Sequence, residues 1–210
     1  MENKALLFDF DGVVLDSEKY YTIFWNKVGE ERLGRKDFGI EIKGSTLTAI
    51  LGNNFDRNDW PEITRQLLAF ENEMPFEYIP GFPEFLKAAK SGGWKTAVVT
   101  SSNKPKMELV YAKLPEIRGF FDRIFTSEDF SESKPSPDCY LKAMAYFGTD
   151  PHHSVVFEDS VNGLISGRDS GAFLVGLSTT NPVETVSRYT SIVIPDYLSR
   201  TPDGLLAGQF

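Results

Sequence analysis

The sequence contains very little cysteine and no long hydrophobic run. Its single cysteine, Cys139, cannot form a disulfide within the chain. The N-terminus passes from Met1 through polar residues into a short apolar segment, without the hydrophobic stretch that a signal peptide carries. The longest apolar runs are far too short to cross a bilayer. We therefore expect a soluble, cytoplasmic protein without a membrane partner.

Basic residues are also in the minority. The 210 residues include 22 lysines and arginines against 30 aspartates and glutamates, which gives a net charge of −8, and no basic run occurs. Such a surface repels polyanions, so nucleic acid is not an expected partner. The length allows one domain with a smaller insert. The composition leaves the oligomeric state open, with a monomer plausible.

Six short apolar runs have the length and composition of buried strands. Beyond Pro80 they alternate with helix-like segments, which predicts an α/β fold with a Rossmann-like parallel sheet covered on both faces. One of these helices is expected to begin with Ser136 as N-cap and Pro137 at its first position. The predicted strands are residues 5–9, 95–100, 123–126, 154–158, 173–177 and 191–194.

Residues from about 17 to 78 have a different pattern, with helix-like segments and no strand between them. Asp16 and Ser17 are expected to cap the first of these helices, and residues 57–73 form a later one. Pro80 and Gly81 then interrupt the helical pattern. We expect a core domain of residues 1–15 and 80–210, with a small α-helical cap domain inserted at residues 16–79.

Four short polar segments occur in a fixed order, and three of them begin where a predicted strand ends. In open parallel sheets, ligands bind at the carboxyl ends of the strands, so we expect these segments to meet. The four segments are Asp9-Phe10-Asp11-Gly12, Thr100-Ser101-Ser102, Lys134-Pro135 and Glu158-Asp159-Ser160.

The two aspartates of the first segment suit phosphoryl transfer. A carboxylate such as Asp9 can attack phosphorus and form an aspartyl-phosphate, which divides a difficult hydrolysis into two steps. Asp11, two residues on and on the same side of an extended backbone, can act as general acid and then as general base. Gly12 allows a tight turn where a side chain would crowd a bound phosphate. Taken alone, both aspartates could instead cap a turn before a helix.

The second segment offers hydrogen-bond donors for a phosphoryl group. The hydroxyl of Thr100 and the amides of Ser101 and Ser102 could hold phosphoryl oxygens, as backbone nests bind other anions. An ordinary helix cap is the competing interpretation.

The last two segments supply charge of both signs. Lys134 lies between a strand and two prolines that would hold its ammonium group in place. Glu158 and Asp159 carry the hard oxygen ligands that Mg²⁺ prefers. For Glu158, an acidic residue at a helix N-terminus remains an alternative.

This set of segments resembles the haloacid dehalogenase-like superfamily of hydrolases, in particular its β-phosphoglucomutase-like branch. The resemblance depends on the order of the segments and on Asp-x-Asp-Gly-x-x-x-Asp-Ser after an N-terminal strand. It implies that Asp9 is the nucleophile and Asp11 the general acid and base. The other residues that it assigns are Thr100 and Lys134 at the phosphoryl group, and Asp9, the main-chain carbonyl of Asp11, Glu158 and Asp159 around Mg²⁺.

The resemblance also suggests which reaction to expect. Dehalogenase relatives typically lack the aspartate at position 11, so its presence favours cleavage of a phosphate ester. Lys43-Gly44-Ser45-Thr46-Leu47 resembles the specificity loop of the family. Mutases of this branch carry an arginine where this chain has Leu47 and a histidine near the hinge where it has Tyr21. We therefore expect a phosphatase for a small phosphorylated metabolite, such as a sugar phosphate.

Two alternatives remain open at this point. A phosphosugar mutase is possible because Lys43 and Lys104 could hold a distal anionic group. A non-catalytic phosphate-binding module is less favoured, since fold alone does not fix function but all four segments are present. The predicted substrate-binding residues are Gly12, Lys43, Gly44, Ser101 and Ser102.

Overall fold

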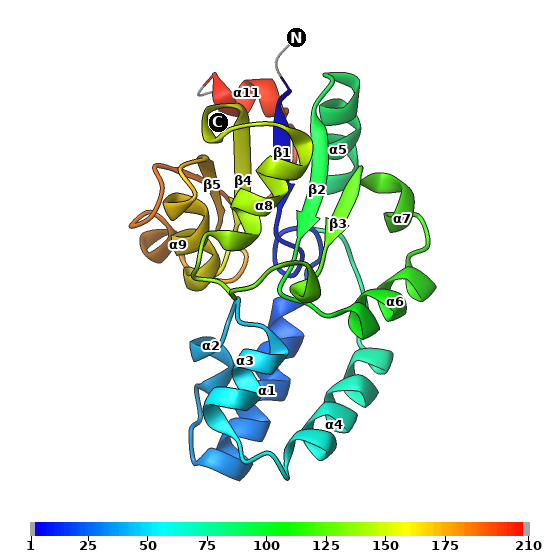
Figure 1. Ribbon diagram of the computed structural model, residues 1–210, viewed down its shortest axis with the longest axis vertical. Coiled ribbons are helices and arrows are strands. Elements are labelled where there is room, and N and C mark those ends of the chain that lie inside the picture. Colours follow the sequence, from blue (N-terminus) through cyan, green and yellow to red (C-terminus); the bar gives the residue numbers. More distant parts are fainter. Residues whose placement is uncertain (1–2, 208–210) are drawn as a thin grey trace.

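A six-stranded parallel sheet lies at the centre of the computed structural model, which describes residues 3–207 (Figure 1). Residues 1–2 and 208–210 of the predicted core domain lie outside the described residues. Each predicted strand is confirmed to within one residue at either end. The strands are β1 (Ala5–Phe8), β2 (Lys95–Val99), β3 (Arg123–Phe125), β4 (Ser154–Glu158), β5 (Phe173–Leu177) and β6 (Ile192–Ile194).

The strand order is β3-β2-β1-β4-β5-β6, so the direction of winding reverses beside β1. Phe8 of β1 pairs with Val98 of β2 on one side and with Phe157 of β4 on the other. The amide of Asp9 donates to the Phe157 carbonyl at 3.0 Å. This reversal brings the ends of β1 and β4 together at the point where open α/β sheets bind ligands.

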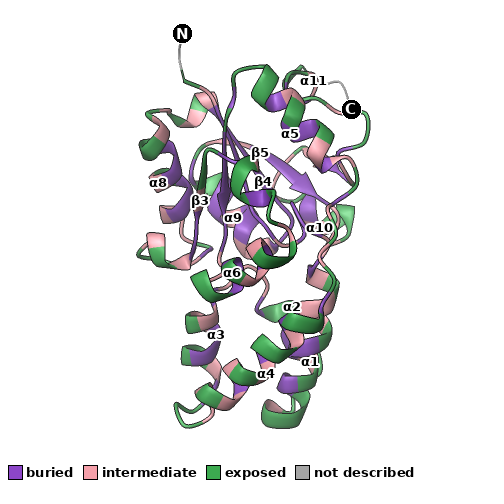
Figure 2. Ribbon diagram, turned by 90° about the vertical axis from the view of Figure 1, so that its right-hand side faces the viewer, coloured by how far each residue is buried: buried purple, intermediate pink, exposed green. Residues whose placement is uncertain are grey.

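Two hydrophobic clusters cover the sheet, one on each face. Successive residues of β1 alternate between them, with Leu6 and Phe8 in the first and Leu7 in the second. Figure 2 shows the buried strands between the two helical layers. Helices contributing to the first cluster are α5 (Phe82–Ser91), α6 (Lys104–Lys113), α7 (Ile117–Phe120) and α11 (Pro202–Leu206), and those of the second are α8 (Asp138–Phe147), α9 (Val161–Asp169) and α10 (Val183–Val186).

Helix α8 begins one residue later than predicted. Pro137 occupies the N-cap position, and the amide of Asp138 donates to the hydroxyl of Ser136 at 3.3 Å. Short 3₁₀ helices cover Ser127–Asp129 and Pro151–His153. None of the helices in the described part of the chain is long and apolar enough to cross a membrane.

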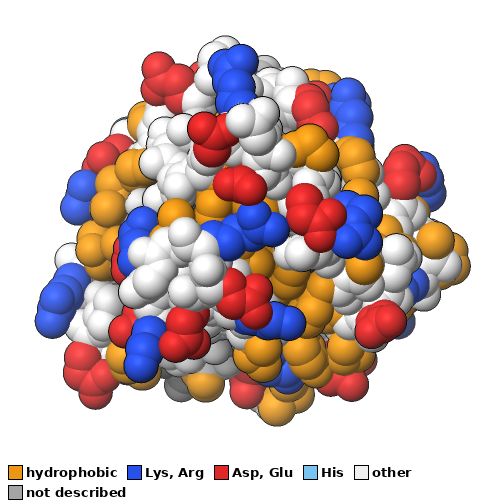
Figure 3. Space-filling view, turned by 90° about the horizontal axis from the view of Figure 1, so that it is seen from below, with side chains coloured by type: hydrophobic (Ala, Val, Ile, Leu, Met, Phe, Trp, Pro, Cys, Tyr) orange, Lys and Arg blue, Asp and Glu red, His pale blue; other side chains and the backbone are white. Residues whose placement is uncertain are grey.

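Four helices between β1 and α5 form a bundle beyond the carboxyl ends of the strands (Figure 1). They have their own hydrophobic cluster, which includes Trp25, Phe38 and Leu67. We call this bundle the helical insert: α1 (Glu18–Leu33), α2 (Phe38–Glu41), α3 (Leu47–Asn54) and α4 (Trp60–Glu73). The end of the molecule that carries the insert has acidic and basic side chains interspersed with apolar ones (Figure 3).

The two chain segments that join the insert to the sheet run side by side. The amide of Asp16 donates to the Glu77 carbonyl and the amide of Ile79 to the Val14 carbonyl, both at 2.9 Å. This arrangement supports a core interrupted by a cap at residues 16–79, and we retain those boundaries as a proposal.

Candidate active site

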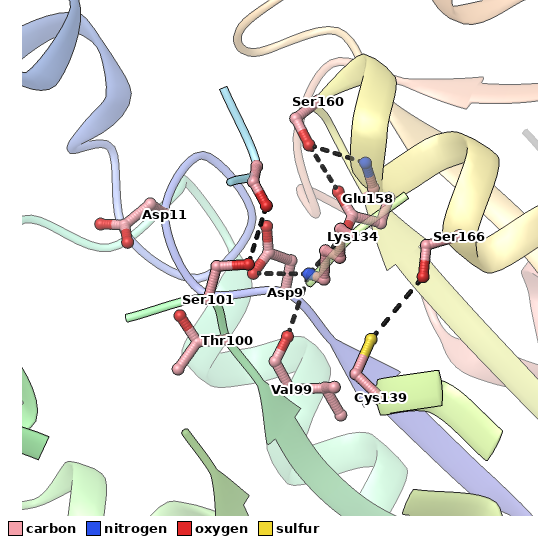
Figure 4. A network of polar contacts seen from close by, with 12 residues as sticks. Asp9, Asp11, Val99, Thr100, Ser101, Lys134, Cys139, Glu158, Ser160 and Ser166 are labelled. Atoms are coloured by element: carbon pink, nitrogen blue, oxygen red, sulfur yellow. Dashed lines mark hydrogen bonds and ion pairs between the residues drawn. The ribbon is translucent and has the colours of Figure 1, made fainter. Parts of the chain in front are cut away.

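Three carboxylates meet where β1 and β4 end. Asp9 follows β1, Glu158 is the last residue of β4, and Asp159 comes next. One ligand oxygen from each lies within 4.8 Å of the other two, and all three residues are buried. The polar contacts around Asp9 and Glu158 are drawn in Figure 4.

Lys134 lies between two of these carboxylates. Its ammonium group is 2.7 Å from Glu158 Oε1 and 3.1 Å from Asp9 Oδ1, and it donates to the Val99 carbonyl at 3.1 Å. Burial alone would lower the pKa of Lys134, but Asp9 and Glu158 raise it above its ordinary value. The lysine is therefore a fixed cation inside the site.

Glu158 is held by donors on both of its oxygens. Oε1 accepts from the hydroxyl of Tyr140 at 2.7 Å as well as from Lys134, while Oε2 accepts from the Asp159 amide at 3.1 Å and from the Ser160 hydroxyl at 3.4 Å. Tyr140 is fully buried in α8. Its hydroxyl therefore helps to fix the orientation of Glu158.

Asp159 differs from its two neighbours because both of its carboxylate oxygens are buried without a hydrogen-bond partner among the described residues. The buried hydroxyl of Thr180 lies beside this carboxylate and opposes the rise of its pKa, but in the described part of the chain it too has no partner at hydrogen-bonding geometry. Burial and the charges of Glu18 and Glu158 raise the pKa of Asp159 well above its ordinary value. A buried carboxylate without donors is costly unless a cation is bound there. The three carboxylates therefore fit a hard divalent cation such as Mg²⁺.

The pKa of Asp9 is also raised by burial and by the carboxylates near it. Burial, and then the charge of Glu158, raise the pKa of Asp9 to about 7 against the opposing effect of Lys134. A cation bound among these residues would favour the ionised form that a nucleophile requires.

Asp11 lies beyond the end of β1, and its carboxylate points away from that of Asp9 (Figure 4). Both residues nevertheless line the same cavity, although Asp11 lies past the end of the strand. The Asp11 carboxylate accepts from the ammonium group of Lys106 and from the hydroxyls of Ser17 and Ser102, the last at 3.1 Å. Ser17 thus contacts Asp11.

The predicted side-chain cap of α1 is wrong. Ser17 is the N-cap residue by position, but its side chain makes no capping hydrogen bond. The carboxylate of Asp16 accepts instead from the side chain of Lys19.

The second polar segment lines a cavity and does not cap the helix that follows it. Asn103 is the N-cap of α6 and accepts from the Lys106 amide at 3.1 Å. The hydroxyl of Thr100 accepts from the Ser102 amide at 3.0 Å, and that of Ser101 donates to the Gly44 carbonyl at 2.8 Å. The cap interpretation of this segment is therefore excluded.

The two predicted glycines serve close contacts between segments. Gly12 has a φ of 76°, and a β-carbon there would lie 2.0 Å from an Asp159 oxygen. A side chain at position 12 would therefore collide with the carboxylate of Asp159. Gly12 is not among the residues that line the cavity, where a phosphate was expected to bind. Gly44 does line it, with a φ of 79°, and a β-carbon would lie 2.6 Å from the Ser160 hydroxyl.

A cavity of about 150 Å³ separates the strand ends from the helical insert. The core contributes Asp9 and Asp11, while the insert contributes polar and apolar side chains. Of the predicted site residues, those that line the cavity are Asp9, Asp11, Lys43, Gly44, Thr100, Ser101 and Ser102, whereas Lys134, Glu158 and Asp159 lie buried beside Asp9.

Sequence reasoning missed several polar residues at or beside this cavity, among them Glu18, Glu71, Lys106 and Tyr140. Glu71 had a detectable signal, since it continues the buried stripe of Ile63 and Leu67 at intervals of four residues. A carboxylate in such a stripe is unusual unless it is paired. For Tyr140, nothing in the sequence shows that its hydroxyl donates to a site residue; the pattern fits any aromatic residue of the core equally well.

Comparison with known proteins identifies the family. The model of the haloacid dehalogenase-like hydrolases matches residues 6–177, so the chain belongs to this family. It is 29% identical over 211 residues to a phosphoglycolate phosphatase of Aquifex aeolicus, covering 90% of this chain and 95% of the relative. It is 26% identical over 208 residues to β-phosphoglucomutase of Bacillus subtilis, covering 90% of each. The predicted β-phosphoglucomutase-like branch is thereby confirmed.

A solved structure supports the fold. The haloacid dehalogenase family hydrolase of Entamoeba histolytica superposes with a TM-score of 0.81 at 22% identity, covering 99% of this chain and 98% of that one.

Proposed function

We propose that the protein is a Mg²⁺-dependent phosphatase that hydrolyses a small phosphorylated metabolite through an aspartyl-phosphate on Asp9. The observation that carries this proposal is the position of Asp9. It follows the central strand, faces a cavity, lies 3.1 Å from the ammonium group of Lys134 and belongs to a cluster of three carboxylates. A nucleophile needs this combination of access and positive charge.

The reaction would proceed in two displacements at phosphorus. A carboxylate oxygen of Asp9 attacks phosphorus, and the bond to the ester oxygen breaks as protonated Asp11 gives its proton to that oxygen. Water then attacks the phosphorus of the aspartyl-phosphate, Asp11 accepts the proton of the water, and Asp9 and inorganic phosphate are released. Because Asp11 is engaged with Lys106, Ser17 and Ser102, it must exchange these partners to reach the leaving oxygen.

In this proposal Lys134 and Thr100 stabilise the charge that develops on the phosphoryl oxygens. Lys134 stays charged beside Asp9, and Thr100 lines the cavity next to the amides of Ser101 and Ser102. Asp9, Glu158 and Asp159 would hold the metal ion, with the main-chain carbonyl of Asp11 as a further ligand. When bound, Mg²⁺ neutralises phosphoryl charge and orients the group for in-line attack.

A phosphosugar mutase is the second candidate, favoured by the similarity to β-phosphoglucomutase. The cavity argues against it. Leu47 lines the cavity where the mutases carry an arginine, Lys43 lies 3.8 Å from the carboxylate of Glu18, and Lys104 is exposed and outside the cavity lining. A mutase must bind both ends of a bisphosphate while it excludes water.

Two assays test these alternatives. Turnover of para-nitrophenyl phosphate is expected with Mg²⁺ and not with excess EDTA, whereas a binding module would show none in either condition. With β-glucose 1-phosphate and a trace of glucose 1,6-bisphosphate, release of inorganic phosphate should exceed formation of glucose 6-phosphate. The reverse ratio would establish the mutase.

A further inference from the structure

Both lysines that line the cavity lie beside carboxylates. Lys106 forms an ion pair with Asp11, and its ammonium group lies 4.2 Å from the centre of the Tyr21 ring. The ammonium group of Lys43 lies 3.8 Å from the Glu18 carboxylate. Among the described residues of the cavity wall there is therefore no basic side chain without a carboxylate beside it.

Glu71 places a further carboxylate on the insert side of this cavity. It lies in α4, its residue is 3% exposed, and Oε1 accepts from the Tyr21 hydroxyl at 2.9 Å. No hydrogen bond from a described residue reaches Oε2, and Glu71 is part of the cavity lining. One acceptor oxygen of a nearly buried carboxylate is thus available to a ligand.

The chemistry of the ligand follows from these two observations. A leaving group that fills the cavity displaces water from Oε2, and this loss must be offset by a hydrogen-bond donor. A second anion would face the carboxylate of Glu71 in a water-poor space, where like charges repel strongly. Neither lysine would be free to pair with this anion, because Lys43 lies beside Glu18 and Lys106 pairs with Asp11. A neutral group with several hydroxyls can donate to Glu71 and needs neither lysine as a counter-ion.

We propose that Glu71 determines specificity by selecting phosphomonoesters of uncharged polyhydroxy alcohols and rejecting leaving groups that carry a second anion. The inference rests on the proposed phosphatase function, which it narrows. It distinguishes this chain from its phosphoglycolate phosphatase relative, whose named substrate carries a carboxylate.

Glucitol 6-phosphate and 6-phosphogluconate form a matched pair for the test. Both are open six-carbon chains with one phosphate, and they differ only in a hydroxymethyl group or a carboxylate at C1. Their dissociation constants are measured by calorimetry with Mg²⁺ on Asp9→Asn protein, so that the comparison does not depend on turnover. We expect glucitol 6-phosphate to bind at least about tenfold more tightly.

The variant Glu71→Gln keeps an acceptor for the Tyr21 hydroxyl but removes the charge. Made in the Asp9→Asn background, it should reduce the preference for the polyol phosphate to about threefold or less. Glu73→Gln, at an exposed position of the same helix, is the matched control and should leave the preference unchanged. A thermal melt of each variant confirms folding.

Three outcomes would overturn the inference: equal or tighter binding of 6-phosphogluconate, no measurable binding of either ligand, or an unchanged preference in Glu71→Gln. Failure of the proposed phosphatase is seen separately, as absence of para-nitrophenyl phosphate turnover by the wild-type protein.

Discussion

The ammonium group of Lys106 forms an ion pair with the carboxylate of Asp11, although the two residues lie 95 positions apart in the chain. Both side chains are largely withdrawn from solvent, with exposed fractions of 7% and 13%. The hydroxyls of Ser17 and Ser102 complete the contacts of this carboxylate. The orientation of Asp11, the proposed general acid, therefore depends on Ser17 at the start of the insert and on Ser102 and Lys106 after β2.

Replacing Lys106 should weaken catalysis. In Lys106→Met, the carboxylate of Asp11 loses its ion pair and that of Glu71 loses the positive charge that opposes the rise of its pKa on burial, and we expect kcat/KM to fall by about tenfold or more. Steady-state assays with para-nitrophenyl phosphate and Mg²⁺ measure this. Lys104→Met, at an exposed position in the first turn of the same helix, is the control and should behave as wild type. An unchanged kcat/KM in Lys106→Met would show that the ion pair has no part in turnover.

Tyr140 offers a test of the metal site from outside its ligand set. Tyr140→Phe removes the donor that lies 2.7 Å from Glu158 Oε1 and keeps the ring. Because groups that orient metal ligands tune affinity, the Mg²⁺ concentration for half-maximal activity should rise by about tenfold. The measurement is a Mg²⁺ titration of activity.

The matched control for this change is Tyr146→Phe, since Tyr146 lies in the same helix and is 57% exposed. Its Mg²⁺ requirement should equal that of the wild type. If Tyr140→Phe needs the same Mg²⁺ concentration for half-maximal activity as this control, the hydrogen bond from Tyr140 to Glu158 does not affect metal binding.

Stability should depend on pH differently with and without the metal. The pKa of Asp9 rises from an ordinary 3.8 to about 7 in the folded, metal-free chain. Between these values the native state holds a proton that the unfolded state has lost, so this contribution to stability falls as pH increases. Mg²⁺ binds the ionised carboxylates, and its stabilising effect should therefore grow over the same interval.

Thermal melts in EDTA and in excess Mg²⁺, at several pH values between about 5 and 8, measure this effect. The difference between the two melting temperatures should increase with pH in the wild type and much less in Asp159→Asn. Parallel curves in the wild type would mean that no metal ion binds to these carboxylates.

The sheet was predictable because its strands are continuous buried runs, in which periodicity and length agree. The meeting of Asp9 with Glu158 followed from the rule that parallel strands end at the same edge. The family resemblance supplied their roles, and these remain proposals. The resemblance assigned Lys134 to the phosphoryl group; the structure has it buried beside Asp9, which nothing in a lone lysine indicates.

Other features depend on contacts that local sequence does not encode. The carboxylate of Asp11 pairs with Lys106, 95 positions later in the chain, and the residues around Asp11 give no sign of this partner. Ser17 was expected to cap α1, but its hydroxyl donates to Asp11, six residues earlier, and makes no capping hydrogen bond. Glu71 reaches the cavity only because α4 of the insert packs against α6 of the core, a contact that the local sequence does not reveal.

The most direct test of the central claim is the rate of phosphate release by Asp9→Asn at saturating Mg²⁺ and para-nitrophenyl phosphate. Asparagine is nearly isosteric with aspartate but cannot form the acyl phosphate. With an unchanged thermal melt and deamidation excluded by mass spectrometry, we predict a loss on the order of 10³-fold or more in kcat. Retention of more than a few per cent of the wild-type rate would contradict the assignment of Asp9 as the nucleophile.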